Sequence, residues 1–245
     1  MAEEALAMGP ASRLSAADQR HWMLRRLHSL SGILPIGAFL FFHIFENSYV
    51  THGGEAWWNE SAFTRNLPFQ VIVEAIALWI PISYHAVYGI VITVTAEPNV
   101  VEYGTERNLQ YTLQRITGIL ALAFILFHFF TTRGWFYLSG VETNYARMHA
   151  FMMNPVYLSA YIIGTLACLY HLTNGIFTFC ITWGVTVGPR AQTMVNRACV
   201  ALFLVFSVMA IVTLISFRAP ASRSRPARWE HRKESAPKRC RGRSA

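Results

Sequence analysis

The sequence predicts an all-α integral membrane protein, a bundle of five transmembrane helices. Hydrophobic residues make up 53% of its 245 residues, and charged residues make up only 14%. Asp, Glu, Lys and Arg are absent from residues 27–45, 75–96, 116–132, 148–189 and 198–217. A helix needs about 20 mostly apolar residues to cross the hydrocarbon core of a bilayer, so each stretch indicates one crossing. No hydrophilic stretch is long enough for a separate soluble domain.

The helices follow one another with short connections. We expect them at about residues 27–48, 69–96, 113–133, 155–185 and 196–217. The first begins near Leu27 and is long enough to span, so we do not expect a cleavable signal peptide. Because proline removes a backbone hydrogen bond, Pro35 and Pro81 should bend the first and second helices.

Basic residues set the expected boundaries and orientation. The net charge is +8, but 10 of the 21 Lys and Arg residues lie in residues 218–245, among Pro, Ser and Gly. We therefore expect an N-terminal arm (1–24), a five-helix domain (25–217) and a disordered basic tail (218–245), and no nucleic-acid partner. Of the other 11 basic residues, eight lie on the side of the N-terminus, which the positive-inside rule places in the cytoplasm. Five crossings would place the basic tail outside the cytoplasm, which the same rule disfavours, so the tail counts against this orientation.

Each of the first four spans contains a histidine: His43, His85, His128 and His171. An ionisable group in the bilayer core is costly, so each histidine indicates a functional site. The motif YHxxxGI occurs at residues 84–90 and again at 170–176, and the similar sequences SGIL and TGIL precede His43 and His128. Such a repeat indicates one structural unit used twice.

Depth predicts how the histidines pair. His43 and His128 lie about 15 residues from the inner ends of their helices, which places both roughly 22 Å from the cytoplasmic edge. His85 and His171 lie at a similar distance from the outer edge, so they should share an inner layer. Two imidazoles from neighbouring helices in each layer are the ligand set of a bis-histidine haem, and two stacked haems are expected. The sequence lacks CxxC and CxxCH, so it indicates neither a zinc site nor a thioether-linked haem.

Three glycines fit this interpretation. Gly89 and Gly175 each follow a histidine by four residues, on the same helix face, and Gly32 lies 11 residues before His43, at the level of the inner pair. A missing side chain at these positions would make room for a porphyrin ring. Small residues in spans also serve helix packing, so the glycines alone decide little.

Several motifs resemble a known family. They are RRLHSL at residue 25, LPFQVIVEAIALWIPISYHAVYG at 67, LQRITG at 113, FHFF at 127 and YHLTNGIFTFCITWGVTVGPR at 170. In order and spacing, residues 24–217 resemble the cytochrome b membrane anchor of succinate dehydrogenase (succinate:quinone oxidoreductase). The resemblance is to the single-subunit, five-helix, two-haem type of bacteria such as Bacillus.

The resemblance implies that His43, His85, His128 and His171 are axial ligands of two haem b groups. It implies a flavoprotein subunit that oxidises succinate, an iron–sulfur subunit, a membrane quinone acceptor, for which menaquinone is expected, and a place in the bacterial cytoplasmic membrane. Fumarate reductases have related anchors, so the direction of the reaction stays open.

Further residues are candidates for the cofactor and quinone sites. The basic groups that could pair with haem propionates are Arg25, Arg26, His28, Arg115 and Arg190, although arginines here also serve as cytoplasmic anchors. His28 and Ser29 lie at the mouth of the inner layer and could hydrogen-bond a quinone. Glu74 precedes His85 by 11 residues, which places it roughly 16 Å further out, at the depth of the outer pair. Its carboxyl could exchange protons with a quinone, or it could be a helix-end carboxylate that reaches water. We expect Glu46, one turn beyond His43, at the outer interface.

Other functions share parts of this pattern. The anchors of hydrogenases and formate dehydrogenases and ascorbate-dependent transmembrane reductases also use paired histidines for two haems. A transporter or scaffold could use the same histidines for protons or for packing. A reduced-minus-oxidised spectrum separates the haem proteins from the last class.

Overall fold

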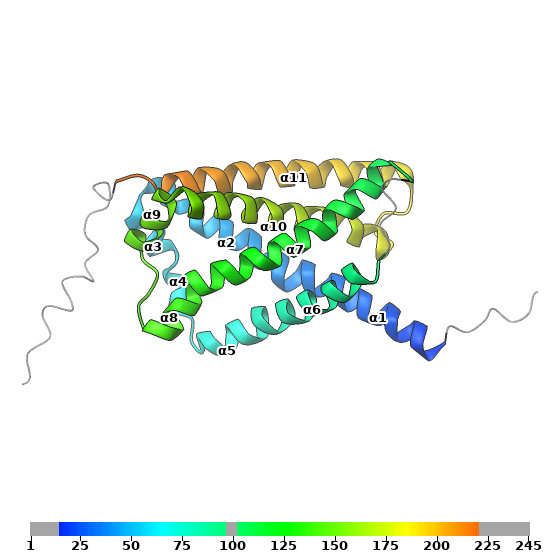
Figure 1. The fold of residues 1–245 in the computed structure, drawn as a ribbon, viewed down its shortest axis with the longest axis horizontal. Helices are drawn as coiled ribbons and strands as arrows, with labels where there is room; N and C mark the ends of the chain where they lie inside the picture. Colours follow the sequence, from blue (N-terminus) through cyan, green and yellow to red (C-terminus); the bar gives the residue numbers. More distant parts are fainter. Residues whose placement is uncertain (1–14, 97–101, 221–245) are drawn as a thin grey trace, which may run out of the picture. The chain divides into compact units, whose positions relative to one another are not determined.

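The computed structural model describes residues 15–96 and 102–220, and these residues are helical with short connections. The expected N-terminal arm lies partly outside the described residues, and the expected tail lies outside them from residue 221 on. The elements, labelled in Figure 1, are α1 (Ala16–Ser31), η2 (Gly32–Gly37), α2 (Ala38–Ser48), η3 (Tyr49–His52), α3 (Gly54–Glu60), α4 (Ala62–Arg65), α5 (Gln70–Glu74), η4 (Ala75–Trp79), α6 (Ile80–Val94), α7 (Glu106–Thr131), α8 (Arg133–Ser139), α9 (Tyr145–Met153), α10 (Pro155–Thr182) and α11 (Pro189–Ser216).

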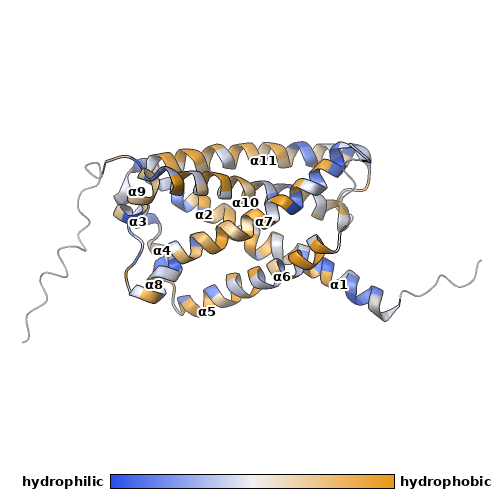
Figure 2. Cartoon of the chain, viewed as in Figure 1, coloured by the Kyte–Doolittle hydropathy of each residue, from blue (hydrophilic) through white to orange (hydrophobic). Residues whose placement is uncertain are grey.

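Five helical segments are long and apolar enough to cross a membrane, which confirms the predicted fold class. They are Asp18–His52, Gln70–Val94, Glu106–Ser139, Pro155–Thr182 and Pro189–Ser216. Hydrophobic residues colour most of α6, α7, α10 and α11 in Figure 2, whereas polar residues gather at the start of α1. Large apolar side chains such as Val87 and Val94 on α6 remain exposed in the chain, as expected for surfaces that face lipid.

Local signals explain where the helices begin and change form. Ser15 and Asp18 form a capping box at the start of α1, which satisfies backbone N–H groups that have no intrahelical partner. Both prolines expected to bend helices are associated with π-helical turns: Pro35 lies inside η2, and η4 leads directly into Pro81 at the start of α6. A wider turn accommodates the missing proline N–H and its ring.

The chain forms two compact units. The first contains the described residues of Met1–Leu40, Val71–Leu122 and Ala167–Phe203. Within it, α1 and α6 lie side by side (Figure 1), and Tyr84 on α6 donates a 2.9 Å hydrogen bond to the backbone oxygen of Leu24 on α1. On α10, a run of residues around Leu169, itself fully buried, forms the most enclosed part of this unit.

The second unit contains the described residues of Phe41–Gln70, Ala123–Leu166 and Leu204–Ala245. Its core is a cluster of large side chains from η3, α3, α9, α10 and the end of α11: Val50, Trp57, Met148, Met152, Tyr161, Leu214 and Phe217. Met152 and Phe217 are almost completely buried. Each unit contains one of the two histidine pairs expected from depth.

Candidate haem-binding sites

The first unit brings His85 on α6 and His171 on α10 together. Their ring centroids lie 6.0 Å apart, and the ring planes are inclined by 88°. A metal–imidazole bond is roughly 2 Å long, so two imidazoles on opposite sides of one metal ion have nitrogens roughly 4 Å apart and centroids roughly 6 Å apart. The observed spacing therefore fits a single metal ion between the two rings. We call these residues the first-unit pair.

Backbone oxygens orient both rings of the first-unit pair. The Nδ1 atom of His85 lies 2.9 Å from the backbone oxygen of His28, and Nδ1 of His171 lies 3.0 Å from that of Gln114. A carbonyl oxygen can only accept, so each Nδ1 carries the proton and each Nε2 keeps its lone pair for a metal. The two hydrogen bonds occupy corresponding positions of the sequence repeat. The donors, His85 and His171, are 86 residues apart (171 − 85), and so are the acceptors, His28 and Gln114 (114 − 28).

The second unit brings His43 on α2 and His128 on α7 together, as the second-unit pair. Their ring centroids lie 5.8 Å apart, with planes inclined by 68°. Here side chains surround the rings. The hydroxyl of Tyr161 lies 3.3 Å from Nδ1 of His128, and Nδ2 of Asn47 lies 3.4 Å from both ring nitrogens of His43. Asn47 is itself oriented, because its Oδ1 accepts a 2.9 Å hydrogen bond from Nε1 of Trp57.

Two ligands do not complete the coordination of an iron ion. In the described part of the chain, no group of three or more His, Cys, Asp or Glu residues is placed to bind a metal. The four nitrogens of a porphyrin would supply the remaining donors of a haem iron held by either pair. The pairs fit the axial ligand set of haem rather than a protein-only metal site.

Glycines lie against both rings of the first-unit pair. A Cβ atom on Gly32 would come within 2.5 Å of Cε1 of His85, and one on Gly118 within 2.9 Å of Cε1 of His171. Gly118, in the TGIL sequence, was not among the site residues expected from the sequence, although the repeat with SGIL could have indicated it. Gly89 and Gly175 lie beside the residues that hold the histidines, since their added Cβ atoms would be 3.2 Å from His28 and 3.5 Å from Gln114.

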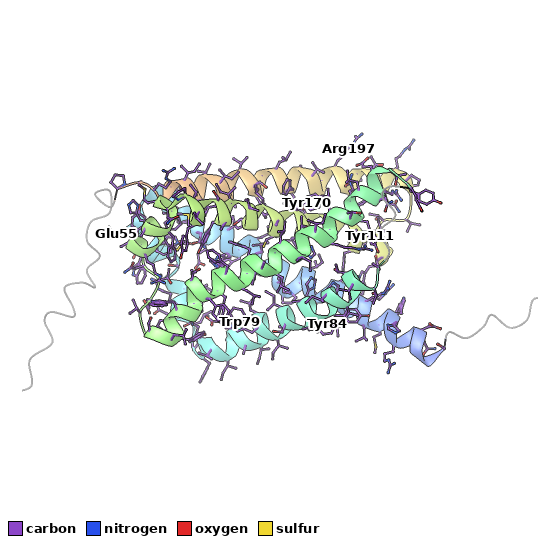
Figure 3. The ribbon with its side chains drawn as sticks, viewed as in Figure 1. Glu55, Trp79, Tyr84, Tyr111, Tyr170 and Arg197 are labelled. Atoms are coloured by element: carbon purple, nitrogen blue, oxygen red, sulfur yellow. The ribbon has the colours of Figure 1, made fainter. Side chains whose placement is uncertain are left out.

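Unpaired polar atoms occur in the first unit, on His28 and on two arginines near His28 and Gln114 in the sequence. Among the described residues, Nδ1 of His28, Nε of Arg26, and Nε and Nη2 of Arg115 are buried without a hydrogen-bond partner. The His28 ring stacks on His85, with centroids 4.0 Å apart. The Arg115 guanidinium lies 3.9 Å from the ring centre of Tyr111, which Figure 3 labels on α7. Buried cationic donors without partners are expected where an anionic group, such as a haem propionate, binds.

The other candidates are placed as follows. Ser29 accepts a 3.0 Å hydrogen bond from Nε1 of Trp183, and Arg26 lies over the ring of the same tryptophan. Arg25 and Arg190 are exposed. Glu74 is half-buried at the end of α5, in the first unit.

Glu46 is buried within the chain. It is only 6% exposed, and its carboxylate accepts a 2.6 Å hydrogen bond from the Thr64 hydroxyl on α4. Helix periodicity alone does not predict this partner, because it comes from a different helix.

Comparison with known proteins identifies the family. Residues 109–217 match the family model described as "Succinate dehydrogenase/Fumarate reductase transmembrane subunit". The succinate dehydrogenase cytochrome b558 subunit of Bacillus subtilis (strain 168) is 36% identical over 201 residues, which cover 82% of this chain and 99% of that protein. The chain belongs to the family of succinate dehydrogenase cytochrome b subunits. This confirms the resemblance in its sequence motifs. As a cytochrome b subunit of this family, it is a membrane anchor within an oxidoreductase complex.

Proposed function

We propose that this cytochrome b subunit carries electrons from the iron–sulfur subunit of a succinate dehydrogenase through two haem b groups to a membrane quinone, with menaquinone as the expected acceptor. The observation that carries the proposal is the occurrence of two imidazole pairs, 6.0 Å and 5.8 Å apart, one in each compact unit. A flavoprotein subunit oxidises succinate, and this chain contributes no succinate site. The chain lies in a bacterial cytoplasmic membrane, with its N-terminus in the cytoplasm.

Haem iron, when bound, supplies the one-electron chemistry that amino-acid side chains lack. The protein contributes the ligand geometry. The backbone oxygens of His28 and Gln114 accept hydrogen bonds from the Nδ1–H groups of His85 and His171, which leaves the Nε2 atoms free to hold the haem iron. The glycines at positions 32 and 118 allow the neighbouring helices to approach the two imidazole rings closely.

Charged and polar side chains have separate roles in the first unit. Arg115 and Arg26 would hold the haem propionates through guanidinium atoms that have no hydrogen-bond partner among the described residues. Gly89 and Gly175 leave space at the edge of the same site. The buried, unpaired Nδ1 of His28 is suited to hydrogen-bond a propionate or a quinone carbonyl. Ser29, the next residue, is the second candidate for the quinone.

Glu74 is the proposed proton-exchanging group of the quinone site. The role rests on its 11-residue spacing from His85, which places it roughly 16 Å further toward the outer side of the membrane along the helix. A carboxyl at that depth can transfer protons to or from a quinone as the quinone is reduced.

Copurification tests the proposed function directly. The full complex is isolated through a tag on this chain, and its flavin, iron–sulfur and haem contents are measured before and after succinate is added. We expect a flavin-bearing subunit and an iron–sulfur subunit, and a cytochrome b spectrum that succinate reduces. A chain isolated without haem contradicts the proposal, and so does haem that succinate does not reduce in the intact complex. The ratio of succinate oxidation to fumarate reduction in the same preparation distinguishes the two activities in the family's description.

A further inference from the structure

The two halves of the repeat hold their histidines with different side chains. With the 86-residue spacing of His85 and His171, position 114 corresponds to 28, and position 174 corresponds to 88. The half around His171 therefore has Gln114 and Asn174 where the half around His85 has His28 and Tyr88. One half places a pair of amides beside its histidine, and the other places two aromatic rings.

The amides form a closed network with His171. The backbone oxygen of Gln114 accepts from Nδ1 of His171 at 3.0 Å, and Nε2 of Gln114 donates back to the His171 backbone oxygen, also at 3.0 Å. The side-chain oxygen of Gln114, Oε1, accepts a 2.7 Å hydrogen bond from Nδ2 of Asn174. Asn174 is only 7% exposed. Because a bilayer offers few alternative partners, the network should be rigid and should fix the relative placement of α7 and α10 around the ring.

The network extends along α7 away from His171. Nδ2 of Asn174 also lies 3.3 Å from the backbone oxygen of Gln110, whose side chain donates to Asn196 on α11 at 3.4 Å. Tyr170, labelled in Figure 3 on α10, packs against Phe203 of α11 with ring centroids 5.9 Å apart. The side of α10 behind His171 is therefore tied to two neighbouring helices.

The corresponding side of His85 is built differently. His28 and Tyr88 are in ring contact, with centroids 5.8 Å apart, and Nδ1 of His28 has no hydrogen-bond partner within the described ranges. His85 keeps the backbone contact of the repeat, but a stacked imidazole replaces the amide beside it. His28 thus keeps an unpaired ring nitrogen that a ligand could use, whereas the side chain of Gln114, at the corresponding position, is bonded to α10.

We propose that Gln114 and Asn174 are positioning residues for His171, a clamp that fixes the direction of this imidazole. The proposal rests on the proposed function, since it assigns His171 to a haem. It predicts that loss of the clamp changes the electronic properties of one haem and not of the other, because the second-unit pair has its own supports in Asn47 and Tyr161.

The test uses the intact complex with Asn174→Leu, Gln114→Met and the double variant. The matched control is Thr173→Val: Thr173 is equally buried on the same helix, but its hydroxyl bonds to Leu169 and Tyr170 in α10 itself. The readouts are haem content, the midpoint potential of each haem, and the low-spin electron paramagnetic resonance signal of each oxidised haem. Signals are assigned by their loss in His85→Ala and His43→Ala.

We expect Asn174→Leu and Gln114→Met to move the potential and resonance signal of the first-unit haem, or to remove that haem alone. The double variant should be no worse than the stronger single variant, because residues that act as one unit are not additive. Thr173→Val should leave both haems unchanged. If Asn174→Leu does not accumulate in membranes, Gln114→Met is judged by the same readouts, and Asn174→Thr, which restores a hydrogen-bond donor, should recover the wild-type signal in part.

The proposal is overturned if both single variants leave the first-unit haem unchanged, or if they change the two haems equally. Equal effects from Thr173→Val would also overturn it, since they would indicate general disturbance of α10. Failure of the proposed function gives a different result, because the wild-type complex would then contain no haem, or haem that succinate does not reduce.

Discussion

A methyl group added at Gly32 should weaken binding of the first-unit haem. The new Cβ would lie 2.5 Å from Cε1 and 2.9 Å from Nδ1 of His85. Carbon atoms pack best at about 3.5–4.0 Å, so the ring would have to retreat by about 1 Å. Metal–ligand distances tolerate about 0.2 Å. The His85 ring cannot retreat freely, because its Nδ1 lies 2.9 Å from the backbone oxygen of His28. His28 precedes Gly32 by one helical turn, so both contacts to the ring come from the same helical segment.

The expected cost follows from these distances. Overpacking typically costs about 1–3 kcal/mol, and each 1.4 kcal/mol is a factor of ten in binding. Haem affinity at this site should therefore fall by about 5-fold to 150-fold. The assay is haem per chain with a reduced-minus-oxidised spectrum of purified Gly32→Ala protein, in which one of the two components should be reduced and the other unchanged.

Other glycines provide a graded series for the same assay. Gly118→Ala should have a smaller effect, because its Cβ would lie 2.9 Å from His171. Gly175→Ala should be tolerated, since its nearest contact would be 3.5 Å, and Gly188→Ala is the control with nothing within 4 Å. If Gly32→Ala binds both haems with an unchanged spectrum, the reasoning about this close approach is wrong.

Three further substitutions test separate parts of the proposed sites. Tyr161→Phe removes the hydroxyl 3.3 Å from His128, so it should shift the potential of the second-unit haem in a redox titration and leave the first unchanged; equal shifts in both would contradict this. Arg115→Gln removes buried guanidinium atoms that have no hydrogen-bond partner in the described chain, so the first-unit haem should dissociate faster. The dissociation rate is measured by transfer of haem to apomyoglobin, and an unchanged rate would exclude a propionate contact. Glu74→Gln should keep both haems and their reduction by succinate but slow the reduction of a menaquinone analogue; normal turnover would move the quinone site toward His28 and Ser29.

Helix positions were largely predictable because apolar length is a strong signal. Residues 155–185 were expected as a helix, and α10 covers Pro155–Thr182. The last helix was expected from residue 196 but begins at Pro189, because a helix can continue beyond its apolar stretch and Arg190 and Arg197, both exposed, do not interrupt it. The two π-helical turns were not predicted, since a bend at proline does not specify which hydrogen bonds replace the lost one.

The candidate sites were predictable only in part. The repeat and the helix depths indicated how the four histidines would pair, because both are properties of sequence position. The Gln114–Asn174 network depends on which polar side chains meet between α7 and α10, and periodicity places a residue on a face without specifying its partner. Burial of Glu46 likewise depends on the path of the connection that carries Thr64.

Spectra of the four single histidine variants test the central claim most directly. Haem per chain and reduced-minus-oxidised spectra are measured for His43→Ala, His128→Ala, His85→Ala and His171→Ala in the purified complex. Because His43 and His128 lie 5.8 Å apart in one unit and His85 and His171 lie 6.0 Å apart in the other, the wild-type chain should bind two haems, and each variant should lose one. The His43 and His128 variants should lose the same spectral component, and the His85 and His171 variants the other. Loss of the same component from the His43 and His85 variants would contradict the pairing, and four variants with unchanged haem content would contradict the assignment of these histidines as ligands.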